Sequence, residues 1–276
     1  MDKGEERGYL RAMNSSEEHP SGRISGPDLS LAIPCYNESA VVKTTVRDLV
    51  EAFGRSDTSI ELVLVDNGST DDTGAIIDGL VAEGHPIVKR EVAINEGYGN
   101  GVLVGLASCT GRTVGFICAD GQVDARDVVK LYEAVARSST PKLAKVRRRF
   151  RMDGAKRKVV SIIYNGFANV VFMGLQSIDI NGNPKIFPRE YLERMDLRST
   201  DWFLDAEVML RAKQLGLPVF EMNVFAQMRP DGESHVRSST IWEFILNLLR
   251  WRFRTPPPVS GGSLEGTEHS SVEVGP

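Results

Sequence analysis

Short apolar runs alternate with amphipathic segments along the first half of this chain. Four runs have the length and the branched, apolar composition of buried strands, and a helix-like segment follows each of them. The runs span residues 29–34, 60–65, 87–92 and 113–118. The helical segments begin near residues 38, 71, 98 and 124. This alternation predicts an α/β fold, in which a mostly parallel sheet is flanked by helices on both faces.

The regular alternation loosens in the second half of the chain. A basic run at 142–158 is followed by apolar helical stretches at about 159–175 and 240–253. We interpret this half as an extension of the same domain, which we place at residues 28–239. No internal repeat divides it.

The two ends of the chain are polar. Residues 1–27 are rich in Ser, Glu and Gly, and residues 255–276 begin near a proline run that stops the preceding helix. Neither segment can form a core, so both are predicted to be disordered. Before the second tail, residues 240–254 form a helix with a narrow polar face among Trp, Phe, Ile and Leu. Such a helix suits a membrane interface, and the alternative is packing against the core or a second subunit.

The composition is that of an ordinary globular protein, with 41% hydrophobic and 25% charged residues. Three scattered cysteines and four unclustered histidines argue against a disulfide framework and a zinc site, and fit a reducing cytoplasm. A net charge of -4 gives no overall case for nucleic acid. We expect neither a signal peptide nor a transmembrane helix, because no apolar run of about 18–20 residues occurs.

Ligands of such sheets bind beyond the carboxyl ends of the strands, so the residues after each strand are candidate site residues. Pro34, Tyr36 and Glu38 follow the first strand, and Asp66 follows the second. A carboxylate there can accept a hydrogen bond from a base or a ribose, while Tyr and Pro can wall a base. The alternative at the second strand is a helix cap made by Ser or Thr within residues 69–72.

The fourth strand ends in Cys118-Ala119-Asp120-Gly121-Gln122, with one carboxylate where the strand stops. Such a carboxylate is a candidate ligand for a divalent cation that is bound together with substrate phosphates. The alternative role, a cap of the following helix, fits Asp124 better than Asp120.

These strand-end motifs resemble those of the family 2 glycosyltransferases with the GT-A fold. The resemblance begins with "IPCYNE" and "VDNGSTDDT", spaced by about one strand–helix–strand unit. It extends to the polyprenyl-phosphate glycosyltransferases, the group that contains dolichol-phosphate mannose synthase, through "GFICADGQVDARDVVKLYEA", "DINGNPKIFPRE" and "RPDGESHVR". Roughly residues 29–237 are covered. The resemblance implies a GT-A sheet, and the residue pattern at 240–254 adds a C-terminal amphipathic helix.

The resemblance also implies which residues hold the donor, a UDP- or GDP-sugar. They come from the first two strand ends, from a "GYGNG" loop near the donor and from "RPDGESHVR": Pro34, Tyr36, Glu38, Asp66, Gly97, Arg229 and Ser234. Arg229 would counter the diphosphate. His235 replaces the usual Lys of this motif and would carry charge only at lower pH.

Two residues match the metal ligands of the group. Asp120 and Gln122 would hold Mg²⁺ or Mn²⁺ together with the diphosphate of the donor. Cys118 stands where the group has its first Asp. A thiol is a poor ligand for a hard ion, so we expect Cys118 not to ligate it.

The basic run lies where the group carries arginines that bind an acceptor phosphate, and Arg147 and Arg157 match them. Arginine suits bidentate capture of phosphate. The alternative is a solvated, charged loop. Nucleic acid is disfavoured, because Phe150 is the one aromatic of the run and no stacking series is present.

The resemblance therefore implies an inverting glycosyltransferase that transfers a sugar to a polyprenyl phosphate. Such an enzyme would face the cytoplasm and contact the membrane peripherally, with a homo-oligomer as an alternative use of its last helix. A second hypothesis keeps the fold and gives the sugar to a soluble hydroxyl acceptor, with Asp205 as the general base. A third hypothesis is a non-catalytic protein that binds the nucleotide sugar.

Overall fold

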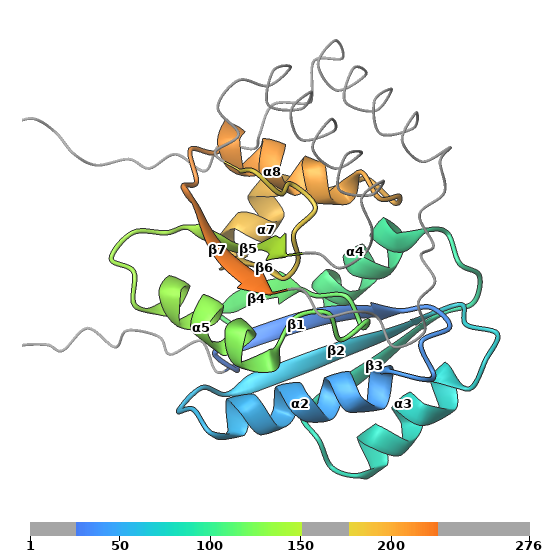
Figure 1. Ribbon diagram of the computed structural model, residues 1–276. Coiled ribbons are helices and arrows are strands. Elements are labelled where there is room, and N and C mark those ends of the chain that lie inside the picture. The colour runs from blue at the N-terminus through green and yellow to red at the C-terminus, as the bar shows by residue number, and fades with distance from the viewer. Residues whose placement is uncertain (1–25, 151–176, 226–276) are drawn as a thin grey trace, which may run out of the picture.

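A computed structural model of the chain describes residues 26–150 and 177–225. Within these residues a seven-stranded sheet carries helices on both faces (Figure 1). The expected tails, the 240–254 helix and the site residues Arg157, Arg229 and Ser234 lie outside this part of the chain, so the expected domain boundaries stay a prediction.

The first half consists of four strand–helix units, and the predicted strands and helices are confirmed. In chain order they are β1 (Leu29–Cys35), α2 (Val42–Gly54), β2 (Ile60–Asn67), α3 (Thr73–Ala82), β3 (Ile87–Val92), α4 (Tyr98–Ser108), β4 (Thr113–Phe116) and α5 (Ala125–Ala136). The four strands are parallel to one another, with β1 between β2 and β4.

The second half adds β5 (Leu143–Phe150), β6 (Lys185–Pro188), α7 (Glu190–Met195), α8 (Leu204–Gln214) and β7 (Val219–Phe225). The order across the sheet is β3-β2-β1-β4-β6-β5-β7, with β6 antiparallel to both of its neighbours. The basic run therefore begins as a strand. The alternative of a solvated loop is wrong for its first residues, because Lys145 is fully buried.

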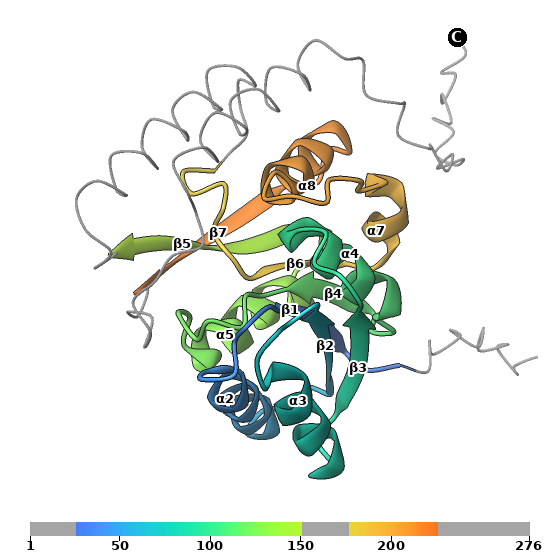
Figure 2. The ribbon, with the colours of Figure 1, turned by 90° about the vertical axis from the view of Figure 1, so that its right-hand side faces the viewer.

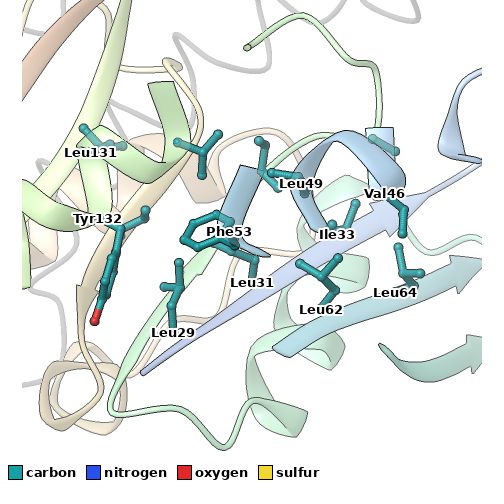
Figure 3. Packing of buried hydrophobic residues seen from close by; sticks show 14 of the residues in the cluster. Leu29, Leu31, Ile33, Val46, Leu49, Phe53, Leu62, Leu64, Leu131 and Tyr132 are labelled. Carbon is teal, nitrogen blue, oxygen red and sulfur yellow. The ribbon is translucent and has the colours of Figure 1, made fainter. Parts of the chain in front are cut away.

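Helices cover both faces of the sheet (Figure 2), and an apolar cluster lies on each face. Alternate residues of β1 point to opposite faces, as the period of a strand requires. One face packs against α2 and α5 through aliphatic and aromatic side chains (Figure 3), among them Leu29, Leu31, Ile33, Leu49, Phe53, Leu131 and Tyr132. The other face carries Ala32 beneath α4 and α8. Each fully buried Leu, Ile or Phe contributes about 1.5–3 kcal/mol.

The register of the strands places their carboxyl ends together. Cys35 pairs with Asp66 across β1 and β2, and Ala32 pairs with Phe116 across β1 and β4. The loops that follow β1, β2 and β4 consequently lie at one edge of the sheet, where the candidate residues were expected.

Candidate active site

The residues expected to hold a nucleotide lie at the ends of β1 and β2. Pro34 is half-buried at the end of β1, and Tyr36 is 37% exposed in the loop beyond it, followed by Glu38. Asp66 is buried, and its Oδ1 accepts a hydrogen bond from the N–H of Ser69 at 3.0 Å. The structure thus brings an exposed ring and two carboxylate residues to one end of the parallel sheet.

The helix after β2 begins differently from the capping alternative. Asp72 is the N-cap residue of α3, and its side chain makes no cap hydrogen bond. The N–H of Ser69 donates to Asp66 Oδ1, and the N–H of Thr70 donates to Asn37 Oδ1 in the loop after β1. Because the N-cap position belongs to Asp72, neither Ser69 nor Thr70 is the cap. The capping role expected for Asp124 is confirmed on α5, where its carboxylate accepts the N–H of Arg126 at 2.9 Å.

Asp120 and Gln122 form a tight turn beyond β4. The Oδ1 of Asp120 accepts the N–H of Gln122 at 3.1 Å. Gly121 between them has a φ of 63°, in the left-handed region that glycine adopts without steric cost. Both side chains are more than nine-tenths buried and line a pocket of about 270 Å³.

The pocket has a polar wall that the sequence did not indicate. Besides the turn 117–126, its lining comprises one face of α2, Arg148 from β5 and Asn183 before β6. The α2 side contributes Thr45, Asp48, Leu49, Glu51, Ala52 and Arg55. The nucleotide-side residues Pro34, Tyr36, Glu38 and Asp66 do not line it. The pocket beyond β4 and the carboxyl ends of β1 and β2 are therefore two separate regions, lined by different residues.

Cys118 lines the pocket beside Asp120. Its Sγ lies 4.0 Å from the hydroxyl of Tyr98 and 3.8 Å from the Nδ2 of Asn183. Tyr98 stacks on Trp202, with ring centroids 4.3 Å apart, and burial raises the pKa of its hydroxyl. The thiol therefore packs among the side chains that shape this wall.

Arg148 is held in the pocket by Asp179. Its Nε and Nη2 donate to the two carboxylate oxygens of Asp179, each at 2.9 Å. Burial opposes ionisation of this carboxyl, but the guanidinium of Arg148 and the ammonium of Lys145 hold the pKa of Asp179 well below its usual range. Arg147, the residue expected at an acceptor phosphate, is only partly buried and does not line the pocket.

Lys145 is a buried cation, and sequence analysis did not predict its burial or its ion pair. Its Nζ donates to the carbonyls of Val146 and Asp179, at 2.9 and 2.5 Å, and to Glu221 Oε1 at 2.9 Å. Burial lowers the pKa of Lys145 to about 8. Lys145 and Glu221 thereby fix the backbone of Asp179, whose side chain holds Arg148. The one available signal was that Lys145 stands among apolar residues in "LAKV".

Asp205, the general base of the second hypothesis, forms a buried ion pair with Lys185. It is 3% exposed on α8, and one carboxylate oxygen binds the ammonium of Lys185, which is fully buried. The other oxygen accepts the Nδ2 of Asn183 at 3.3 Å. Burial lowers the pKa of Lys185. Asp205 does not line the pocket.

Gly97 precedes α4, and the expected "GYGNG" loop is wrong from Tyr98 onward, because those residues form the first turn of the helix. Gly97 has a φ of 117°, and a Cβ there would lie 2.5 Å from the carbonyl oxygen of Thr200. Its own carbonyl accepts the Nδ2 of Asn67 at 3.0 Å. These contacts pin the start of α4 between the end of β2 and the segment before α8.

Between residues 26–150 and 177–225, no three His, Cys, Asp or Glu side chains gather as a metal site. Of the helices in the same residues, none has the length and hydropathy needed to cross a bilayer.

Comparisons with family models and with known proteins both give glycosyltransferases. The model of the family described as glycosyl transferase family 2 matches residues 30–196. Glycosyltransferase AglD of Haloferax volcanii is 29% identical over 80% of the chain, which spans only 36% of that protein. Undecaprenyl-phosphate mannosyltransferase of Micrococcus luteus is 25% identical, with 79% of the chain and 91% of the relative covered.

A solved structure shares the fold. Glucosyl-3-phosphoglycerate synthase from Mycobacterium tuberculosis, in complex with Mn²⁺, UDP and glucosyl-3-phosphoglycerate, superposes with a TM-score of 0.63. The alignment covers 82% of this chain and 80% of the synthase at 20% identity. The GT-A fold expected from the motifs is thereby confirmed.

Proposed function

The chain belongs to glycosyltransferase family 2, and from this premise we propose that it transfers a sugar from a nucleotide-diphosphate sugar to a polyprenyl phosphate, with inversion at the anomeric carbon. Curated relatives are named as glycosyltransferases, so the non-catalytic hypothesis is set aside. The observation that carries the acceptor assignment is Arg148, a cation held in the same pocket as Asp120.

The donor would bind at the ends of β1 and β2. Tyr36 offers an exposed ring for the base, and the carboxylates of Glu38 and Asp66 offer acceptors for base or ribose donors. Since one carboxylate serves uracil and guanine alike, the donor class is a UDP- or GDP-sugar. The outward-facing Tyr36 and the adjacent strand ends support this assignment.

Asp120 and Gln122 fit a hard divalent cation. Mg²⁺ and Mn²⁺ take oxygen ligands and are commonly held by one or two carboxylates plus substrate phosphates. These two residues provide one carboxylate and one amide oxygen on the wall of the pocket. The ion would neutralise charge on the departing diphosphate. Arg229 and Ser234 complete the proposed diphosphate contacts from outside the described residues.

The acceptor phosphate would be held by Arg148, together with the expected Arg157 from outside the described residues. A phosphate oxygen attacks the anomeric carbon, the bond from that carbon to the diphosphate oxygen breaks, and the nucleoside diphosphate leaves. The acceptor is already an anion, so no proton has to be removed and no general base is required. The buried pairing of Arg148 with Asp179 supports this role, because it fixes the direction of the guanidinium.

The second candidate, transfer to a soluble hydroxyl, requires Asp205 as the base. Both oxygens of that carboxylate already have partners in Lys185 and Asn183, and the side chain is 3% exposed. A base must reach the proton that it removes. This geometry favours the phosphate acceptor.

A polyprenyl phosphate resides in a membrane, so we propose that the enzyme works at the cytoplasmic membrane surface as a peripheral protein. Undecaprenyl-phosphate and dolichyl-phosphate enzymes among its relatives support this location. The helix expected to make the contact, 240–254, lies outside the described residues.

The test is transfer from a panel of UDP- and GDP-sugars with Mn²⁺, each with and without a short polyprenyl phosphate. We expect one donor to label the lipid, and the labelling to stop when the metal is chelated. Donor turnover that ignores the lipid would instead support the soluble acceptor. A matched Asp120→Asn variant should lose about two to three orders of magnitude in kcat, as expected for removal of transition-state charge stabilisation.

A further inference from the structure

The loop after β1 and the turn after β2 are joined by their own side chains. Residues 36–41 form the loop and residues 68–72 form the turn. They are separated by about thirty residues in sequence and by one strand spacing in the sheet, because Cys35 pairs with Asp66. The side chains of Asn37, Ser69, Asp71 and Thr73 make the cross-links. The proposed reaction uses neither Asn37 nor Asp71.

Asn37 fixes the turn against the loop. Its Oδ1 accepts the N–H of Thr70 at 2.8 Å and the hydroxyl of Thr70 at 3.3 Å. Its own N–H donates to the Oγ of Ser69 at 3.2 Å. The backbone of Asn37 has a φ of 53°, in the left-handed region that Asn tolerates better than most side chains.

Asp71 closes the same connection from the other side. Its Oδ2 accepts the N–H of Ser39 at 3.2 Å, and its Oδ1 accepts the N–H of Thr73 at 3.0 Å. The hydroxyl of Thr73 donates to Asp71 and accepts the N–H of Glu38 at 2.9 Å. Slight burial acts to raise the pKa of Asp71, but the hydrogen bonds from Ser39 and Thr73 outweigh it and lower the pKa.

The cross-links lie between the residues proposed to hold the nucleotide. Asn37 stands between Tyr36 and Glu38, and Asp71 is in the turn that starts beyond Asp66. A shift of either loop would change the distance between the ring and the two carboxylates. Hydrogen bonds that span both loops therefore set the relative positions of these three groups.

We propose that Asn37 and Asp71 are positioning residues that hold the two loops in the geometry for binding a nucleoside diphosphate before it arrives. This inference rests on the proposed function, since it takes Tyr36, Glu38 and Asp66 as the nucleotide contacts. Ordering a loop costs conformational entropy. If the two loops are already ordered in the folded protein, nucleotide binding does not have to supply this free energy. Loss of the cross-links consequently weakens donor binding and leaves the bond-making step unchanged.

Two variants and one matched control test the proposal. Asn37→Gly removes the amide and keeps a residue that adopts left-handed backbone without strain. Asp71→Ala removes the second cross-link. Asp72→Ala makes the same chemical change at the adjacent residue, which is exposed and makes no cap hydrogen bond. The probes are UDP and GDP with Mn²⁺, titrated by calorimetry into the full-length chain.

We expect Kd for the bound nucleotide to rise about tenfold in Asn37→Gly and in Asp71→Ala, as for loss of a preorganised loop, and less than about twofold in Asp72→Ala. The donor KM should rise in parallel while kcat at saturating donor stays within about twofold. A residue that only stabilises the fold would lower the amount of folded enzyme and would not split KM from kcat in this way.

Hydrogen exchange distinguishes the outcomes. The Thr70 amide should exchange faster in Asn37→Gly, because its acceptor is gone. Faster exchange with an unchanged Kd would overturn the positioning role. A wild-type chain that binds neither UDP nor GDP would overturn the donor assignment itself, and the positioning role with it.

Discussion

Two adjacent arginines of β5 have different surroundings. Successive residues of a strand face opposite sides of the sheet, so a shift of one position exchanges the two environments. Arg148 reaches Asp179 and the pocket, while Arg147 does not. Sequence analysis chose Arg147 because it matches an arginine of the group that the chain resembles, and the basic run offers no sign of which arginine faces the pocket. The partner that decides it, Asp179, lies 31 residues further along the chain.

Substitution of Arg148 tests the acceptor contact. Arg148→Lys keeps the charge but cannot make the bidentate pair with Asp179, so it avoids leaving a buried carboxylate without a cation. We expect kcat/KM for polyprenyl phosphate to fall about 10²-fold, as for a misplaced positioning group, with little change in UDP or GDP affinity. Arg147→Lys is the control. A larger loss in the Arg147 variant would contradict the assignment.

Asp205 is predicted to stabilise the fold rather than to remove a proton. Asp205→Asn leaves the Lys185 ammonium buried without its counter-ion, which should lower the free energy of unfolding by about 3–5 kcal/mol. Urea unfolding measures this loss, and transfer activity per folded molecule should stay within about tenfold. The double variant Asp205→Asn, Lys185→Met should recover stability. Unchanged stability with abolished transfer would favour the hydroxyl-acceptor hypothesis.

At the scale of elements, the four strand–helix units were predictable because each obeys a local period. The strands β5, β6 and β7 were not. The buried cations Lys145 and Lys185 make their sequences look solvent-facing, and the carboxylates that neutralise them, Glu221 and Asp205, come from distant elements. Because the partners are far apart in sequence, a short stretch of sequence cannot show that these lysines are paired and buried. Sequence analysis singled out the turn of Asp120 and Gln122, but not Arg148 and Asn183, which line the same pocket.

The packing of α4 against the segment before α8 gives a prediction with a matched control. A Cβ at Gly99 would lie 2.4 Å from the carbonyl oxygen of Ser199, so Gly99→Ala should lower the free energy of unfolding by about 1–3 kcal/mol through overpacking. Gly79→Ala on α3 meets nothing within 4 Å and should raise it by about 0.5–1 kcal/mol. Equal effects in urea unfolding would contradict this packing.

At the scale of the whole molecule, the buried network around Lys145 links stability to pH. The pKa of Lys145 is about 8 in the folded chain, below its ordinary 10.5, so between these values the unfolded chain binds more protons. The free energy of unfolding then rises with pH in this window, by about 3 kcal/mol in total from this group. Urea unfolding from pH 7 to 10.5 should show a steeper rise in wild type than in Lys145→Met, where the lowered pKa of Lys185 still contributes. A slope shared by both proteins would exclude Lys145 as its source.

The two parts of the proposed site lie at the carboxyl ends of different strands. The β1 and β2 ends present the proposed nucleotide contacts, and the β4 end presents Asp120 beside Arg148. We propose that the nucleophile is an anionic phosphate, which needs no base. Asp205, the base of the hydroxyl-acceptor hypothesis, does not line the pocket and forms an ion pair with Lys185.

The most direct measurement compares a short polyprenyl phosphate with the matching polyprenol as acceptors, using the donor that the panel selects. If the acceptor phosphate is the nucleophile, the phosphate should give labelled lipid and the alcohol none. The product mass should equal that of the lipid phosphate plus one sugar. Equal labelling of the alcohol, or transfer only to a soluble hydroxyl acceptor, would contradict it.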